Sequence, residues 1–186
     1  MYESQPNPLI LVLGGVRSGK SSYAQRLAEK SSRVTFVATA ERRDDEEMHC
    51  KIERHRADRP QHWTTVEEPV ALADVVHSAA ENSDTILIDC LTLFGANLLE
   101  KYAGDAACIE TCIKALCVAL QNRRCRVILV SNEVGSGVVP AYALGRRFRD
   151  LVGEINQRIA AVADTVVLMV AGLPLPLKGS LEGGRP

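Results

Sequence analysis

Short runs of consecutive apolar residues alternate along the chain with longer stretches in which apolar and polar residues are mixed. The apolar runs are rich in β-branched residues and lie at 9–14, 33–39, 85–89, 126–131 and 165–172. Such runs are typical of parallel strands that are covered on both faces. The mixed stretches predict helices at 19–31, 44–58, 69–82, 92–101, 105–123 and 141–163. Strands that alternate with helices predict an α/β fold with a mostly parallel sheet flanked by helices.

The length of 186 residues suits one domain with a substantial core. There is no internal repeat and no low-complexity linker, so we expect a single domain over residues 1–186. Residues 1–8 and 179–186 are rich in polar residues, glycine and proline, and we expect these ends to be peripheral.

Composition argues against several classes of partner. Hydrophobic residues make up 46% and charged residues 24%, the net charge is −1, and the sequence pI is about 6.4. This balance gives no overall attraction to nucleic acid or to an anionic membrane, so an anion site must be local. We also expect no membrane span and no secretory signal, because no apolar run approaches the ~20 residues of a span and the first residues lack a basic-then-apolar pattern.

The six cysteines contain no CxxC pair, which argues against a structural zinc site. Free thiols in a reducing cytoplasm are the expected state, and the cytoplasm is the expected location. The cysteines are Cys50, Cys90, Cys108, Cys112, Cys117 and Cys125.

The segment GGVRSGKS follows the first predicted strand and opens the first predicted helix. It fits the phosphate-binding pattern G-x-x-x-x-G-K-[ST], in which glycines let backbone N–H groups curl around phosphate oxygens. The helix N-terminus adds partial positive charge, the lysine reaches the β and γ phosphates, and the serine ligates Mg²⁺. We therefore predict that a nucleoside triphosphate binds here, at Gly14, Gly15, Val16, Arg17, Ser18, Gly19, Lys20 and Ser21.

A second acidic signal supports this interpretation. Asp89 ends the apolar run at 85–89, where a carboxylate could hold Mg²⁺ beside Ser21. The alternative is that Asp89 caps the next helix. The phosphate-binding pattern favours the metal role.

The basic stretch KIERHRADRP surrounds one histidine with arginines. On a helix over 44–58, His55 shares a stripe with Met48 and Ile52, so its side chain should face the protein or a cleft. Nearby guanidinium groups such as Arg54 and Arg56 would lower the pKa of this imidazole and favour its neutral, nucleophilic form. The pattern alone does not exclude a packing or surface histidine.

Two further segments leave alternatives open. Asn132 and Glu133 follow the fourth predicted strand, at the end where α/β proteins usually bind ligands, and the glycine-rich segment 135–137 could be a flexible lip or a turn. Three arginines open the last helix and could contact phosphate across a subunit boundary or form a solvated face. They are Arg146, Arg147 and Arg149.

Several blocks in order resemble the bifunctional adenosylcobinamide kinase / adenosylcobinamide-phosphate guanylyltransferase family of cobalamin synthesis. The resemblance covers about residues 9–178. Its blocks are GGVRSGKS, FVATAE, IERHRADRPQHW, TVEEP, DCLTLFGANLL, VSNEVGSGVVP, RRFRDLVGEINQRIA and AGLPLPLK. The resemblance implies a RecA-like P-loop NTPase fold.

The resemblance also implies a two-step activity. ATP or GTP phosphorylates the aminopropanol hydroxyl of adenosylcobinamide, and His55 then takes GMP from GTP and passes it to the new phosphate. Lys20 and Mg²⁺ would assist both steps, and family members assemble as homotrimers. Phe94 stands where tryptophan is expected in many relatives, a departure that leaves the catalytic assignment intact. The implied nucleotide contacts beyond the loop are Ala38, Thr39, Ala40, Arg56, Ala57, Asp58, Arg59, Glu67 and Asp89.

Two other functions are compatible with the phosphate-binding pattern. One is a P-loop small-molecule kinase in which His55 is structural. The other is a RecA-like regulatory ATPase stimulated by a partner or by DNA, which the short chain and the near-zero net charge disfavour.

Overall fold

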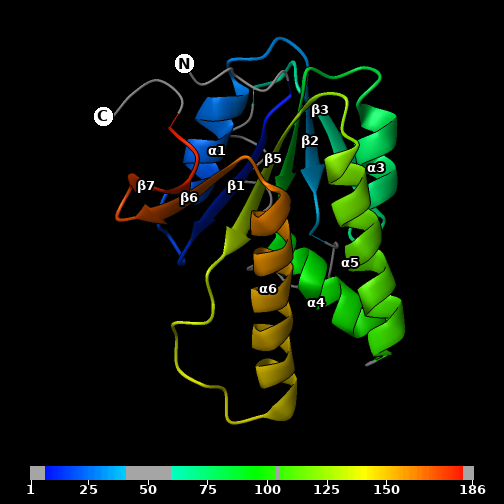
Figure 1. The fold of residues 1–186 in the computed structure, drawn as a ribbon, viewed down its shortest axis with the longest axis vertical. Coiled ribbons are helices and arrows are strands. Elements are labelled where there is room, and N and C mark those ends of the chain that lie inside the picture. The colour runs from blue at the N-terminus through cyan, green and yellow to red at the C-terminus, as the bar shows by residue number, and fades with distance from the viewer. Residues whose placement is uncertain (1–6, 41–59, 104, 182–186) are drawn as a thin grey trace.

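The computed structural model of the chain describes residues 7–40, 60–103 and 105–181. These residues form one seven-stranded sheet in the spatial order β3-β2-β4-β5-β1-β6-β7, with helices on both faces (Figure 1). The strands are β1 Leu9–Gly14, β2 Val34–Ala38, β3 Thr64–Glu67, β4 Thr85–Asp89, β5 Arg126–Asn132, β6 Thr165–Val170 and β7 Leu173–Lys178. The helices are α1 Lys20–Ala28, α3 Leu72–Ala79, α4 Leu91–Lys101, α5 Ala106–Gln121 and α6 Ala143–Val162.

Two hydrophobic cores lie on opposite faces of the sheet. The larger core joins the sheet to α3, α4, α5 and α6, and it includes Phe94, Ile113 and Ile155. The smaller core joins the other face to α1 through side chains such as Tyr23 and Leu27. The central strands are therefore covered on both faces, which explains their nearly continuous apolar sequences.

All five predicted strands are present. In the spatial order of the sheet, each pair of neighbouring strands from β3 across to β6 is parallel. The sequence did not predict β3 or β7. Residues 171–172, assigned to the last predicted strand, form a turn instead. Helices α1, α3, α5 and α6 are shorter at their ends than predicted, whereas α4 begins one residue earlier than predicted, at Leu91. The predicted helix at 44–58 lies outside the described residues.

Strand β7 is antiparallel to β6 and closes one edge of the sheet. In an antiparallel pair, alternate residues direct their N–H groups away from the neighbouring strand. Pro174 and Pro176 occupy alternate positions and pair with Met169 and Val167. Because proline has no N–H, this spacing is tolerated at an open edge and leaves that edge poor in donors for another strand.

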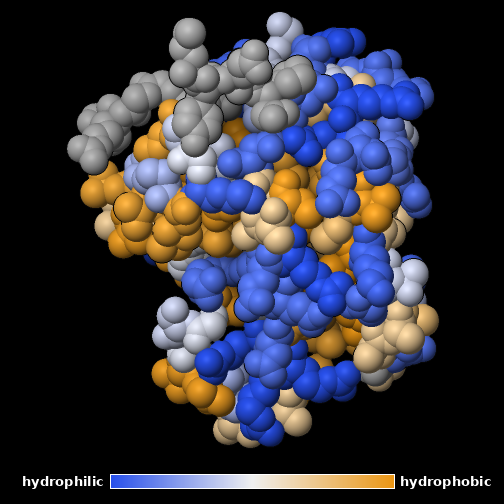
Figure 2. Space-filling model, viewed as in Figure 1, coloured by the Kyte–Doolittle hydropathy of each residue, from blue (hydrophilic) through white to orange (hydrophobic). Residues whose placement is uncertain are grey.

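The face of β6 and β7 that continues the larger core is not covered by a helix of the described residues. Figure 2 shows an apolar patch over this part of the molecule. Leu173 pairs with Val170 and Leu175 pairs with Leu168, so these side chains share one face. Val170, Leu173, Leu175 and Leu177 are each more than half exposed.

Within the described residues, no helix has both the length and the apolar character needed to cross a bilayer. The carboxyl ends of the six parallel strands lie along one edge of the sheet. The connection between β5 and α6 projects beyond that edge (Figure 1). Val138 and Val139 are exposed on this connection. Strand β5 lies between β1 and β4, which places the ends of these three strands side by side.

Candidate nucleotide-binding site

The predicted phosphate loop joins β1 to α1 and adopts a tight, partly left-handed backbone. Gly19 has φ 91° and Arg17 has φ 56°. The Ser18 N–H donates to the Gly15 carbonyl (3.3 Å), and the Tyr23 N–H donates to the Gly19 carbonyl (2.9 Å). The loop therefore leads directly into the first turn of α1, so its N–H groups lie at a helix N-terminus, a favourable place for phosphate.

Glycine at position 14 is required by close packing. A Cβ at Gly14 would lie 2.3 Å from the Ser18 Oγ and 2.9 Å from the Met169 carbonyl oxygen. Gly15 is different, because a Cβ there would meet no atom within 4 Å. Val16 and Arg17 are exposed at the tip of the loop, while Ser18 is buried.

The Lys20 side chain folds back over the loop, where its Nζ donates to the Gly15 carbonyl (3.1 Å). Burial lowers the pKa of Lys20, and the nearby charge of Asp89 partly opposes this shift. This electrostatic link shows that the loop lysine and the strand-end carboxylate lie close together. The structure thus brings together two residues that are 69 positions apart in the sequence.

Three predicted contacts form one row across the carboxyl edge of the sheet. Ala38 of β2 is in register with Asp89 of β4 on one side and with Glu67 of β3 on the other. Adjacent strands are separated by about 4.8 Å, so β4 lies two spacings, roughly 10 Å, from the phosphate-loop strand β1. A nucleotide on the loop could extend along this row.

Thr39, also predicted to contact nucleotide, is buried and joins β2 to β4 and α4. Its Oγ1 donates to the Cys90 carbonyl (2.8 Å) and accepts from the Cys90 N–H (2.7 Å). Its carbonyl accepts from the Asn97 Nδ2 (2.8 Å). The hydroxyl therefore fixes the backbone beside Asp89, and the neighbouring Ala40 is half-buried.

The two predicted metal ligands, Ser21 and Asp89, are oxygen donors of the kind that Mg²⁺ prefers. Ser21 is in the first turn of α1, and Asp89 lies close enough to Lys20 to affect its pKa. Mg²⁺ prefers oxygen ligands and commonly takes one or two from protein together with phosphate oxygens and water. No cluster of three or more histidine, cysteine or acidic side chains suited to a metal occurs in the described residues.

The remaining predicted site residues lie outside the described residues. They are His55, Arg56, Ala57, Asp58 and Arg59. The arginines that open α6 are described, and Arg146 donates to the carbonyls of Pro140 and Ala141. Arg146 therefore holds the end of the β5–α6 connection against the first turn of α6.

The structure adds a support for the phosphate loop that the sequence did not indicate. The turn between β6 and β7 contains Ala171 and Gly172, both with positive φ. The Gly172 N–H donates to the Ser18 carbonyl (3.0 Å), and its Cα would lie 3.3 Å from a Cβ placed at Gly19. The hairpin tip therefore packs directly against the loop. The available sequence signal was the Ala-Gly pair, which is a weak hairpin pattern compared with Asn-Gly or Asp-Gly.

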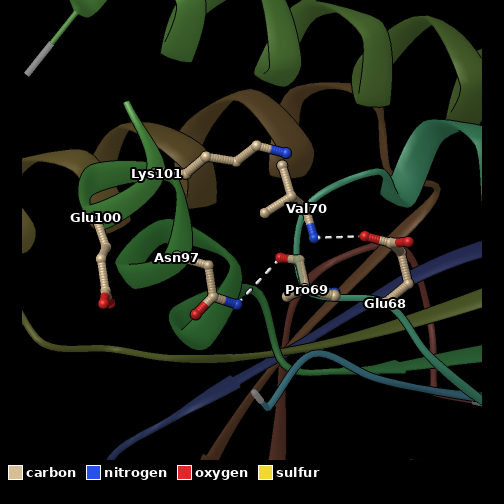
Figure 3. Close-up of a pocket in the computed structure, with 6 residues that line it drawn as sticks. All are labelled: Glu68, Pro69, Val70, Asn97, Glu100 and Lys101. Atoms are coloured by element: carbon tan, nitrogen blue, oxygen red, sulfur yellow. Dashed lines mark hydrogen bonds between the residues drawn. The ribbon is translucent and has the colours of Figure 1, made fainter. Parts of the chain in front are cut away.

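A groove of about 380 Å³ lies on the α4 side of the carboxyl edge (Figure 3). It is lined by Glu68, Pro69, Val70, Asn97, Glu100 and Lys101. The Glu68 Oε1 accepts from the backbone N–H groups of Val70 (2.8 Å) and Ala71 (2.7 Å), and the Asn97 Nδ2 also donates to the Pro69 carbonyl (3.1 Å). These bonds fix the start of α3 against α4.

Solved structures with a similar fold include two secretion ATPases. One is a prototypical ATPase from the type III secretion system of pathogenic bacteria, with a TM-score of 0.52 and 11% identity over 87% of this chain and 50% of that chain. The other is the ATPase EscN from enteropathogenic E. coli, with a TM-score of 0.55 and 10% identity over 89% of this chain and 43% of that chain. The predicted α/β fold, a mostly parallel sheet flanked by helices, is confirmed and is shared with these ATPases.

Curated relatives are much more similar in sequence. The bifunctional adenosylcobalamin biosynthesis protein CobP of Pseudomonas aeruginosa is 48% identical over 170 residues, which cover 91% of this chain and 96% of that protein. The bifunctional adenosylcobalamin biosynthesis protein CobU of Escherichia coli is 41% identical over 181 residues, which cover 91% of this chain and 99% of that protein.

The family model described as "Cobinamide kinase / cobinamide phosphate guanyltransferase" matches residues 10–177. This span includes the phosphate loop, the Asp89 edge and the β6–β7 hairpin. The sequence resemblance is therefore confirmed, and the chain belongs to the cobinamide kinase / cobinamide phosphate guanyltransferase family.

Proposed function

We propose that this chain phosphorylates adenosylcobinamide with ATP or GTP and then transfers GMP from GTP to the new phosphate, through a guanylyl group on His55. The product is adenosylcobinamide-GDP. The observation that carries the proposal is a phosphate loop with Lys20 beside Asp89, in a chain that the family model matches over residues 10–177.

In the kinase step, the substrate hydroxyl oxygen bonds to the γ-phosphorus while the bond to the β–γ bridging oxygen breaks. The loop N–H groups and the Lys20 ammonium stabilise the negative charge on the phosphate oxygens. Lys20 is positioned for this by its bond to the Gly15 carbonyl and by the charge of Asp89. The nucleoside diphosphate is the leaving group.

In the transfer step, a neutral His55 nitrogen attacks the α-phosphorus of GTP, and pyrophosphate leaves. An oxygen of the corrinoid phosphate then attacks the same phosphorus, which releases the imidazole. The arginines Arg56 and Arg59 would neutralise charge on the phosphates and favour the neutral imidazole. This role rests on the sequence pattern around His55.

Ser21 and Asp89 would hold Mg²⁺ together with the phosphates. The ion neutralises phosphate charge in such sites. The protein's own contribution is to present one hydroxyl and one carboxylate beside the loop, with Lys20 close to the carboxylate.

The covalent intermediate can be tested with GTP labelled at the α-phosphate. We expect label to remain on the denatured protein, to be released by acid, and to be discharged when adenosylcobinamide phosphate is added before denaturation. The variant His55→Ala should retain no label but should still phosphorylate adenosylcobinamide. The variant His62→Ala, which removes another histidine, is the matched control and should be labelled normally. Full labelling of His55→Ala would refute the proposed nucleophile.

We also propose that the chain acts as a homotrimer in the cytoplasm. The uncovered apolar face of β6 and β7 supports assembly, because a second copy of the chain could bury its leucines. Sedimentation equilibrium should give three times the 20.2 kDa of one chain. A mass of one or two chains would contradict the trimer and leave the reaction untouched.

A further inference from the structure

Strands β2 and β3 end side by side at the carboxyl edge of the sheet, and the chain then leaves the sheet at both places. Their last residues, Ala38 and Glu67, are in register with each other. Thr39 and Pro69 lie beyond the last registered pair. A backbone carbonyl that is buried beyond the end of a strand needs a hydrogen-bond partner from outside the sheet. The two exits therefore depend on other elements to fix their course.

One side chain from α4 supplies both partners. The Asn97 Nδ2 donates to the Thr39 carbonyl (2.8 Å) and to the Pro69 carbonyl (3.1 Å), and Figure 3 shows the second bond. Asn97 is buried, with 4% of the residue exposed. A primary amide nitrogen carries two N–H groups, so both of its donors are used. Asn97 therefore ties the exits of β2 and β3 to α4 and to each other.

Thr39 extends this connection to β4. Its N–H donates to the Asp89 carbonyl (3.3 Å), and its hydroxyl donates to the Cys90 carbonyl and accepts from the Cys90 N–H. A bond network that starts at Asn97 thus reaches the backbone of three neighbouring strands. These strands end in the row of predicted nucleotide contacts formed by Glu67, Ala38 and Asp89. The geometry of this row depends on the amide of a helix residue that lies outside it.

We propose that Asn97 is a positioning residue for nucleotide binding, whose two N–H groups hold the backbone that presents Ala38, Thr39 and Glu67 to GTP. The inference rests on the proposed function, because it deepens the account of its nucleotide site. Asn97 acts through the backbone and takes no part in bond making or breaking. Since the same row would bind GTP in both steps, loss of the amide should weaken GTP binding in both. The chemistry at the γ- and α-phosphorus should be little affected.

Aspartate at this position would keep the shape of the side chain and remove its N–H donors. Its carboxylate would face the Thr39 and Pro69 carbonyl oxygens, and burial beside these dipoles would raise its pKa. Once protonated, the carboxyl group offers one O–H donor, so part of the network would be restored as pH falls. Alanine at the same position restores nothing at any pH.

Affinity for a non-hydrolysable GTP analogue tests the role without turnover. Relative to the unmodified protein at the same pH, Asn97→Ala should bind the analogue about tenfold more weakly at both about pH 8 and about pH 6, measured by calorimetric titration. Asn97→Asp should lose as much at about pH 8 and recover about threefold at about pH 6. Both variants keep the charged groups of the adjacent groove, so their difference isolates residue 97. These groups are Glu68, Glu100 and Lys101.

Leu98→Ala is the matched control for stability. Leu98 is the next residue on α4, is fully buried in the larger core, and leaves a cavity when truncated. The control should lower the melting temperature at least as much as Asn97→Ala and change the analogue affinity less than twofold. If Leu98→Ala lost as much affinity as Asn97→Ala, destabilisation alone would account for the loss, and the positioning role would be overturned.

Steady-state kinetics separates positioning from catalysis. Asn97→Ala should raise the KM for GTP about tenfold and leave kcat and the KM for adenosylcobinamide within about threefold of the unmodified protein. The GTP concentration that half-saturates labelling by α-labelled GTP should rise in parallel. A lower kcat with an unchanged KM for GTP would contradict the proposal. If the unmodified protein binds the analogue but does not phosphorylate adenosylcobinamide, the proposed function fails, and the affinities of the Asn97 and Leu98 variants still decide the role of Asn97.

Discussion

Individual residues of the phosphate loop meet different physical demands. Gly19 supplies a left-handed backbone conformation that other residues adopt only with strain. Gly14 supplies space, because the Ser18 side chain and the Met169 carbonyl occupy the volume that a Cβ would need. Lys20 supplies positive charge and is kept near the loop by the Gly15 carbonyl. Gly14 and Gly19 are therefore required for different reasons, Gly14 for space and Gly19 for its backbone conformation.

The variant Gly14→Ala should lose both stability and nucleotide binding. The new methyl group would force Ser18 and the strand β6 backbone apart, and such overpacking typically costs about 1–3 kcal/mol. We expect the GTP affinity to fall at least tenfold, because the loop N–H groups no longer converge. Urea denaturation and calorimetric titration measure the two effects.

Gly15→Ala is the matched control, since its added Cβ meets no atom within 4 Å. Its free energy of unfolding should change by less than about 0.5 kcal/mol. If the two variants behaved alike, the close packing at Gly14 would not be what fixes the loop.

At the scale of single residues, the sequence predicted what depends on local pattern. The phosphate loop was identifiable because its glycines, lysine and serine have fixed spacing. The place of Asp89 beside the loop was predicted from its position at a strand end together with the phosphate-binding pattern, but the strand order that brings it near Lys20 was not. The buried role of Thr39 was also hidden, because its hydrogen bonds are to Cys90, 51 positions away.

At the scale of elements, buried parallel strands were predictable and edge strands were not. Strand β3 consists of four residues, Thr64–Glu67, that are mostly exposed, so it lacks an apolar run. Strand β7 contains Pro174 and Pro176, which normally argue against a strand. It forms because β6 pairs with its inner edge while the prolines take alternate positions. The hairpin tip that supports Ser18 could not be predicted without β7.

The packing of α4 on α6 gives a prediction at the element scale. A Cβ at Gly95 of α4 would lie 3.3 Å from the Ile155 Cδ1 and 3.4 Å from the Val152 Cγ2 of α6. The larger side chain of Gly95→Leu would push the helices apart, and we expect a loss of about 1–3 kcal/mol in the free energy of unfolding. Helix α6 also carries Asn156, whose Nδ2 donates to the carbonyl of Asn132, the β5 residue in register with Gly14 of the phosphate loop. A displaced α6 should therefore lower the kinase rate as well.

Gly153→Ala on α6 is the contrasting variant. A Cβ at Gly153 would contact nothing within 4 Å, so the change should stabilise the protein by about 0.5–1 kcal/mol through better helix propensity. Urea denaturation of both variants should give shifts of opposite sign. A destabilised Gly153→Ala would mean that the surface of α6 is packed against something beyond the described residues.

At the scale of the whole molecule, the sheet order explains how distant segments form one site. Strand β5 separates β1 from β4 and brings Asn132 between the phosphate loop and Asp89. The sequence predicted alternating strands and helices, and hence the fold class. It did not predict which strands are neighbours, because spatial order follows from the packing of all helices against the sheet at once.

The ionisable groups of the folded chain limit its stability at both ends of the pH scale. Burial, followed by the charge of Asp89, raises the pKa of the Cys90 thiol from 9.0 to about 11. Burial, followed by the charge of Asp84, raises the pKa of Cys125 to about 11. On the acid side, hydrogen bonds from Arg33 lower the pKa of Asp84.

These directions fix the sign of the expected pH dependence. Between about pH 9 and 11 the unfolded chain releases thiol protons that the folded chain retains, so stability falls as pH rises through this window. The Asp84 carboxylate stabilises the folded state above its unfolded pKa of 3.8, and this contribution is lost as pH falls below that value. The melting temperature should therefore be highest between these limits.

Melting temperatures from pH 3 to 11 test the alkaline limb directly. Because the unfolded chain ionises both thiols in this window while the folded chain retains their protons, the melting temperature should fall by at least about 5 °C between pH 9 and 11. In the double variant Cys90→Ala, Cys125→Ala this fall should shrink, while the acid limb keeps its shape because Asp84 and Arg33 are unchanged. The variant Cys112→Ala, which removes a half-buried thiol on α5, should keep the steep alkaline limb. An equally steep fall in the double variant would assign the alkaline loss to groups other than these two thiols.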